Sequence, residues 1–209
     1  RAYDIMIKTV RRKKMKRIDV YIARVERFSE FAELPEYAKK EIESTTNSSL
    51  IAQKNAAYGL LKHAFKTLNL PFEPQTMFKD ERGKPHANNC NFSFSHTNEL
   101  VCVAVSKSNI GVDIEEVKSH ISLDKTKSHI LFDGEEATTL EEMITLWTKK
   151  EAAFKLDDSI PSYNPSKINT LKYHFKTVFL QDNGKKYAMS IAFEGFSDVN
   201  VVLLDGELL

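Results

Sequence analysis

The sequence predicts an α+β protein made of two related halves. A strand pattern, helical patterns and further strand patterns follow one another twice along the chain, with a natural break near residues 106–109. No repeat is visible at the level of residue identity. Hydrophobic residues make up 42% and charged residues 28% of the 209 positions, which is typical of a globular protein and excludes disordered and collagen-like chains.

The first half is predicted to combine strands with a long helix. Strands are expected over residues 18–25, 91–95 and 100–105. Residues 48–68 carry apolar side chains at spacings of three and four, which indicates an amphipathic helix that Pro71 stops. Residues 71–91 are rich in proline, asparagine, glycine and charge, so we expect an irregular segment there.

The second half is predicted to begin with a strand in which apolar and acidic residues alternate. A helix is expected from about Thr139 to Lys155, and further strands follow it. The predicted strands of this half cover residues 110–117, 168–180, 187–193 and 199–204.

The net charge of +1 conceals an uneven distribution. Residues 1–17 contain eight basic residues against the single acid Asp4, a net charge of +7, which leaves −6 for residues 18–209. We therefore expect a basic N-terminal extension over 1–17, an N-terminal half over 18–107 and a C-terminal half over 108–209. A nucleic-acid arm is the alternative for the extension, but residues 11–17 hold no aromatic residue to stack on bases, so no nucleic-acid partner is expected.

The cysteines and the apolar runs indicate a cytoplasmic protein with no membrane partner. Cys90 and Cys102 cannot build a disulfide framework, and no C-x-x-C motif suggests zinc, so a reducing compartment fits. The longest apolar run, residues 100–105, is far shorter than the roughly 20 residues that span a bilayer. We also expect no signal peptide at the N-terminus.

Two acids in the predicted strand 110–117 are candidate metal ligands. Asp113 and Glu115 are two residues apart, so both side chains project from one face of a strand, about 6–7 Å apart. Paired carboxylates repel each other unless a cation lies between them, and oxygen ligands favour a hard cation such as Mg²⁺. The alternative is an ordinary solvent-facing strand.

The predicted helix 139–155 supplies a second cluster. Trp147, Glu151 and Lys155 follow one another at intervals of four and share one stripe, with Lys150 beside them. Such a stripe is often a solvated face held by ion pairs. Here it carries the only tryptophan of the chain among apolar neighbours, which suggests an enclosed helix whose charges need partners; a metal and a phosphate would serve.

A third cluster lies at the end of the predicted strand 91–95. Ser95 and His96 follow Phe94 there, and Arg82 and Lys84 lie just upstream. A hydroxyl and an imidazole at a strand end can bind phosphate, although a single histidine in this position is often structural.

The order of these clusters resembles the Sfp-type 4′-phosphopantetheinyl transferases. The resemblance rests on G-K-P at 83–85, F-S-F-S-H at 92–96, G-V-D-I-E-E at 111–116 and W-T-K-K-E-A-A-F-K at 147–155. The G-V-D motif lies mid-chain and Glu115 is present, which favours the longer, monomeric branch over the short trimeric synthases. The resemblance therefore implies a pseudo-dimer of two similar α+β halves with the active site in the cleft between them.

The resemblance also implies a reaction. The phosphopantetheine arm of coenzyme A would pass to a serine of an acyl- or peptidyl-carrier protein, releasing adenosine 3′,5′-bisphosphate. Asp113, Glu115 and Glu151 would hold Mg²⁺ against the pyrophosphate of coenzyme A. Glu151 would act as the base for the carrier serine, and Lys155 would contact the pyrophosphate as a catalytic and cofactor-binding residue.

The remaining contacts with coenzyme A are expected from the first half. Lys84, His96 and Ser95 would engage the adenosine 3′-phosphate side or the diphosphate. Relatives commonly use arginines of the first-half helix for a coenzyme A phosphate; this helix has none, and Lys54 is our substitute. The alternative is a non-catalytic module that binds coenzyme A or a carrier protein, against which the retained carboxylates and Lys155 argue.

Overall fold

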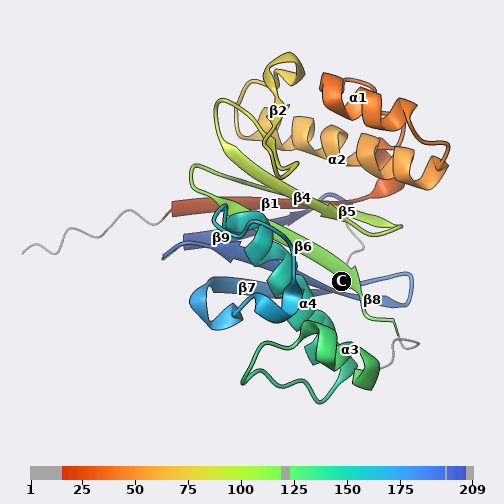
Figure 1. Cartoon of the computed structure of the whole chain (residues 1–209). Helices are drawn as coiled ribbons and strands as arrows, with labels where there is room; N and C mark the ends of the chain where they lie inside the picture. Colours follow the sequence, from red (N-terminus) through yellow and green to blue (C-terminus); the bar gives the residue numbers. More distant parts are fainter. Residues whose placement is uncertain (1–15, 119–122, 196, 206–209) are drawn as a thin grey trace, which may run out of the picture.

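The computed structural model describes residues 16–118, 123–195 and 197–205, and these form two larger sheets and one two-stranded sheet, with helices flanking the larger two (Figure 1). Residues 1–15 of the predicted basic extension lie outside the described residues, and Lys16 and Arg17 already belong to β1. The first sheet has the order β4 (Asn91–His96), β5 (Leu100–Ser106), β1 (Lys16–Arg24), β9 (Ser197–Leu203). The second sheet has the order β6 (Ile110–Glu116), β8 (Lys185–Phe193), β7 (His174–Asp182).

The α-helices occur in two pairs, one before β4 and one before β7. They are α1 (Glu36–Glu43), α2 (Ser48–Thr67), α3 (Leu123–Ile130) and α4 (Leu140–Leu156). A short hairpin of β2 (Phe78–Lys79) and β3 (Pro85–His86) interrupts the segment between α2 and β4. Single turns of 3₁₀-helix lie at Val25–Phe28, Pro74–Thr76, Pro165–Lys167 and Thr170–Lys172.

The two sheets repeat the same strand order. In the first, β5 lies between β4 and β1 and pairs antiparallel with both; in the second, β8 lies between β7 and β6 and pairs antiparallel with both. The last strand, β9, departs from this repeat because it pairs in parallel with β1 of the first sheet. One strand from residues 108–209 therefore completes the sheet of the first half.

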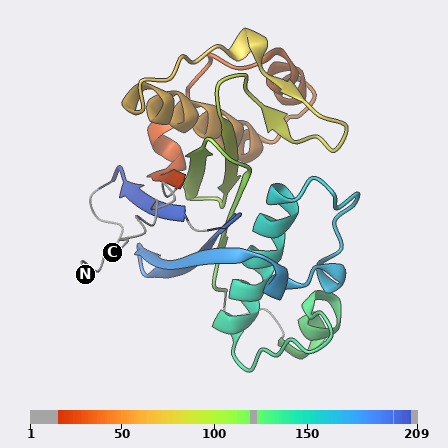
Figure 2. The same ribbon diagram turned by 90° about the vertical axis from the view of Figure 1, so that its left-hand side faces the viewer.

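Strand alternation divides the core into layers, because successive side chains point to opposite faces of a sheet. Val20 and Ile22 of β1 are buried between the sheets with Ile114 of β6, whereas Tyr21 and Ala23 are buried toward α2. Figure 2 shows α2 against the strands of the first sheet and α4 beside those of the second. The order of layers is helix, sheet, sheet, helix.

Local sequence determines where the two long helices begin. Asn47 caps α2, since its Oδ1 accepts from the Leu50 amide at 3.2 Å. Thr139 and Glu142 form a reciprocal capping box at the start of α4, each side chain accepting from the other's amide. The predicted helices 48–68 and 139–155 are confirmed to within a residue or two.

The structure differs from the sequence prediction over residues 168–180. The strand begins only at His174, because the Asn169 side chain accepts from the Leu171 amide and turns residues 170–172 into a 3₁₀-helix. Helices α1 and α3 were not predicted. In the part of the chain that the structure covers, no helix is both long and apolar enough to cross a bilayer.

Helix α4 lies against β6 at Gly111, where a side chain has no room. A Cβ at this position would lie 1.9 Å from the Ala152 carbonyl oxygen and 2.8 Å from the Leu156 nitrogen. Gly111 thus brings Asp113, two residues on in the same strand, close to α4. Glycine in the G-V-D motif has a packing role here.

The Gly111→Ala variant is expected to be destabilised by about 1–3 kcal/mol, because backbone atoms of α4 must shift to accept the methyl group. Urea denaturation followed by far-UV circular dichroism measures the change in the free energy of unfolding. An unchanged unfolding midpoint would contradict the close packing of α4 on β6.

Candidate active site

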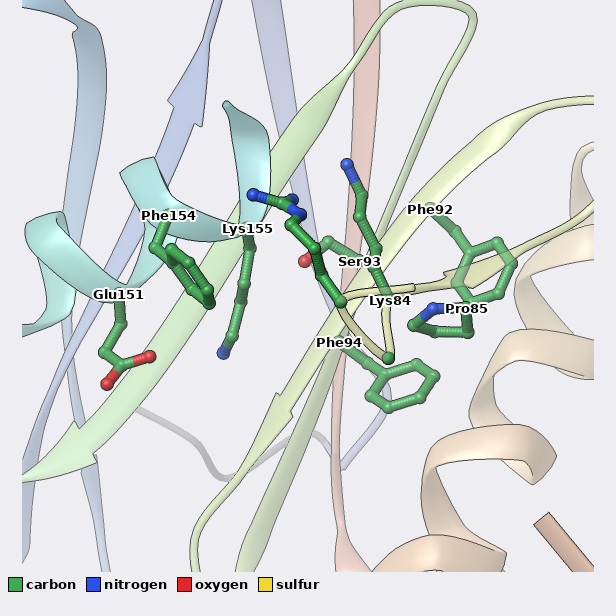
Figure 3. Close-up of a pocket in the computed structure, with 10 residues that line it drawn as sticks. Lys84, Pro85, Phe92, Ser93, Phe94, Glu151, Phe154 and Lys155 are labelled. Atoms are coloured by element: carbon green, nitrogen blue, oxygen red, sulfur yellow. The ribbon is translucent and has the colours of Figure 1, made fainter. Parts of the chain in front are cut away.

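A cavity of about 230 Å³ lies between α4 and the first sheet. Glu151, Phe154 and Lys155 line it from α4, and Figure 3 shows them across from β4 and the β2–β3 hairpin. Residues 82–85 of this hairpin and residues 92–94 of β4 form the other wall. Residues from the G-K-P, F-S-F-S-H and W-T-K-K-E-A-A-F-K motifs therefore line one cavity, whereas Asp113, Glu115, Ser95 and His96 are not among its lining residues.

Asp113 and Lys155 form the central ion pair of this region. The Lys155 Nζ donates to Asp113 Oδ1 at 2.7 Å and to the Val112 carbonyl oxygen at 3.1 Å. The Ser95 hydroxyl donates to the same Asp113 oxygen at 2.7 Å. The other oxygen, Asp113 Oδ2, is buried and has no hydrogen-bond partner among the described residues.

Negative charge is in excess around this pair. Burial, then the charges of Asp113 and Glu151, raise the pKa of Glu115 to about 7. Burial and then Asp113 also raise the pKa of Glu151. Burial alone would lower the pKa of Lys155, but Asp113 outweighs it and raises that pKa. The single positive charge of Lys155 does not neutralise all three neighbouring carboxylates, which belong to Asp113, Glu115 and Glu151.

The arrangement fits a further cation without forming a complete metal site. Among the described residues, no group of three or more His, Cys, Asp or Glu side chains is arranged to hold a metal ion. The buried, unpartnered Asp113 Oδ2 and the raised pKa values of Glu115 and Glu151 are features that a bound cation would stabilise. Carboxylate oxygens are the ligands that Mg²⁺ prefers.

The two lysines expected at coenzyme A phosphates are each paired with a carboxylate. Lys84 Nζ donates to Asp158 Oδ1 at 2.8 Å. Lys54 Nζ donates to Glu41 Oε2 at 2.5 Å, and Lys79 pairs with the other oxygen of Glu41. In each case two cations share one carboxylate, Arg82 and Lys84 at Asp158 and Lys54 and Lys79 at Glu41, so each of these ion-pair clusters keeps one excess positive charge.

His96 lies in a second, smaller cavity of about 90 Å³ beside the first. Lys54 and Lys79 line this cavity with it, and Gly83, Pro85 and Phe94 border both cavities. Burial, then the charges of Lys155 and Lys54, lower the pKa of His96, which favours the neutral imidazole.

Lys150 does not belong to the site, although it adjoins Glu151 in sequence. Its side chain is fully buried, and its Nζ forms an ion pair with Glu135 Oε2 at 2.6 Å and donates to the Ile168 carbonyl oxygen at 2.6 Å. The expectation that a phosphate would compensate the lysines of this helix is wrong for Lys150, because a carboxylate of its own half does so.

Sequence reasoning missed Tyr163, which follows α4. Its ring packs edge-on against Trp147 and Phe154, with centroids 6.2 and 5.3 Å away. Burial, then the charge of Glu151, raise the pKa of its hydroxyl. Residues 157–172 contain neither a regular apolar spacing nor a motif that would identify Tyr163 as a site residue. Its place at the site depends on tertiary contacts with α4.

About half of the chain is similar in sequence to a known protein. A search found similarity to the 4′-phosphopantetheinyl transferase gsp of Aneurinibacillus migulanus, with 30% identity over 103 residues. Part of this chain is similar to a phosphopantetheinyl transferase. The match covers 45% of the chain and 43% of the transferase, so the chain spans less than half of the relative's length. No family model matches the chain.

Proposed function

We propose that this protein transfers the 4′-phosphopantetheine group of coenzyme A to a serine of an acyl- or peptidyl-carrier protein. The observation that carries the proposal is the Asp113–Lys155 ion pair at the cavity that Glu151 and the G-K-P loop also line. The similarity to a phosphopantetheinyl transferase supports the same reaction. The repeated strand order supports a monomer in which two similar halves form a pseudo-dimer with the site between them.

Three carboxylates would hold the metal ion in this proposal. Asp113, Glu115 and Glu151 are the ligands, with the unpartnered Asp113 Oδ2 as the first available oxygen. Bound Mg²⁺ would neutralise charge on the pyrophosphate of coenzyme A. Ser95 orients Asp113, because its hydroxyl donates a hydrogen bond to that carboxylate.

The chain's own residues would then act on the two reacting oxygens. Glu151, whose pKa is raised, accepts the proton of the carrier serine hydroxyl, directly or through a water. The serine oxygen bonds to the phosphorus next to the pantetheine, and the bond from that phosphorus to the bridging oxygen breaks. Adenosine 3′,5′-bisphosphate leaves. Lys155 stabilises the charge that develops on the departing phosphate.

Lys84, His96 and Lys54 would bind the phosphates of coenzyme A. Lys84 must give up Asp158, and Lys54 must give up Glu41, for either lysine to contact a phosphate directly. A lysine keeps the charge of the arginine that relatives use but lacks its bidentate geometry.

The experiment incubates the protein with coenzyme A, Mg²⁺ and a panel of apo carrier proteins from fatty acid, polyketide and nonribosomal peptide synthesis. Mass spectrometry should find one phosphopantetheine added to a carrier serine. The Asp113→Ala variant is expected to lose about 10²- to 10³-fold in rate. Asp198→Ala, which removes an exposed acid of β9, is the matched control and should retain full activity.

The outcome also separates the proposal from its alternative. A folded protein that binds coenzyme A in calorimetry but modifies no carrier would be a non-catalytic binding module. Equal rates for the wild type and Asp113→Ala would contradict a role for the acidic cluster in the reaction.

A further inference from the structure

We propose that Tyr163 is a positioning residue that donates a hydrogen bond to the Glu151 carboxylate and so fixes its orientation toward the acceptor hydroxyl. The inference deepens the proposed function and rests on Glu151 acting as the base. It assigns Tyr163 no proton transfer and no direct contact with coenzyme A.

The first support is the state of the Tyr163 hydroxyl. Its oxygen is buried and has no hydrogen-bond partner in the part of the chain that the structure describes. An unsatisfied buried hydroxyl costs about 1–3 kcal/mol, so such groups generally acquire a partner in the functional state. An ionised carboxylate is the strongest acceptor available, because charge-assisted hydrogen bonds are roughly twice as strong as neutral ones.

The second support is the placement of the aromatic ring. Trp147 and Phe154, which the Tyr163 ring contacts, lie on α4 one turn before and one turn after Glu151. Residues at these spacings share a helix face. The ring is therefore held on the face of α4 that carries Glu151, and of the charged groups that raise the pKa of the hydroxyl, Glu151 has the largest effect.

The third support is the anchoring of the segment that carries Tyr163. On one side the Arg82 Nη1 donates to the Ile160 carbonyl oxygen at 2.8 Å. On the other side Lys150 donates to the Ile168 carbonyl oxygen. Of these two anchoring residues, Arg82 lines the cavity and Lys150 belongs to α4. A side chain between two fixed points can hold a partner in one orientation, which a positioning role requires.

The geometry has a chemical consequence for Glu151. A carboxylate that accepts a hydrogen bond on one oxygen cannot rotate freely, so its other oxygen keeps a fixed direction. In the proposed reaction that second oxygen faces the hydroxyl of the carrier serine. Loss of the donor should reduce the fraction of time in which Glu151 is correctly oriented, and leave the binding of coenzyme A unchanged.

The test compares Tyr163→Phe with Tyr173→Phe. Tyr163→Phe keeps the ring and removes only the hydroxyl. Tyr173→Phe is the matched control, because it removes a hydroxyl that donates to Asp157 at 2.7 Å. We expect Tyr163→Phe to lower kcat for carrier modification about 10- to 100-fold at saturating Mg²⁺, with an unchanged KM for coenzyme A under that condition. The control should keep the wild-type kcat, and thermal unfolding should show that both variants are folded.

A second readout does not depend on transfer. Glu151 is also a proposed metal ligand, so Mn²⁺ affinity measured by electron paramagnetic resonance without coenzyme A should fall about 10-fold or more in Tyr163→Phe and not in Tyr173→Phe. If the wild type modifies no carrier, the proposed function fails and the Mn²⁺ comparison still decides the role of Tyr163. An unchanged kcat, a raised KM with unchanged kcat, or unchanged Mn²⁺ affinity in Tyr163→Phe would overturn the proposal.

Discussion

Lys150→Met is expected to lower the free energy of unfolding by about 3–5 kcal/mol, the largest stability effect that the structure predicts for a single side chain. Lys150 is fully buried, and the carboxylate of Glu135 that it neutralises is itself only 7% exposed. Removing the lysine leaves that carboxylate charged and buried. It also removes the donor to the Ile168 carbonyl oxygen. Urea denaturation gives the change directly.

A double variant separates the charge from the loss of packing. Lys150→Met combined with Glu135→Gln removes the stranded charge, while the amide oxygen can still accept from Thr170. This double variant should be more stable than Lys150→Met alone. If the two variants unfold at the same urea concentration, the ion pair is not the reason why the lysine is needed.

Lys155→Met is expected to lower kcat/KM for carrier modification by about 10²- to 10³-fold. The methionine retains most of the apolar stem and removes the ammonium group that binds Asp113 and the Val112 carbonyl oxygen. Under the proposed function this ammonium group stabilises charge on the departing phosphate, so the loss should fall on kcat. Steady-state kinetics with varied coenzyme A separate kcat from KM.

Lys149→Met provides the control for Lys155. Lys149 lies on the same helix, and its Nζ lies 5.8 Å from the centre of the Phe175 ring, outside the residues that line the cavity. It should leave transfer unchanged. If Lys155→Met raises KM for coenzyme A and leaves kcat intact, Lys155 binds the ground state only and has no part in stabilising the transition state.

The sequence alone predicts those helices and strands whose buried side chains recur at regular intervals along the chain. Alternation identifies β1 and β6, and the three-and-four spacing identifies α2 and α4. The short helix α1 escapes this reasoning because its apolar face consists only of Tyr37, Ala38 and Ile42, too few residues to show a repeating three-and-four spacing. Its helical state depends on tertiary contacts that no local pattern records.

The candidate site, too, is only partly predictable from the sequence. The order of the motifs identifies Asp113, Glu151 and Lys155 as candidate residues, and the structure places them around one region. The sequence does not reveal that Asp113 and Lys155 contact each other, nor that Lys150 faces Glu135. The Asp113–Lys155 pairing follows from the close packing of α4 on β6, and the Lys150–Glu135 pairing from the way the segment between α3 and α4 folds back on α4. Both are properties of the folded molecule.

The pairing of β9 with β1 has a consequence for how the chain acquires its structure. These strands come from opposite ends of the described chain, and the amide of Leu204 donates to the carbonyl oxygen of Ile22 just beyond their ladder. During synthesis β1 leaves the ribosome early, yet its edge is covered only after β9 has followed. Until then a nascent chain exposes an unpaired strand that neighbouring chains can bind. The first half therefore reaches its final form only when translation of the second half is nearly finished.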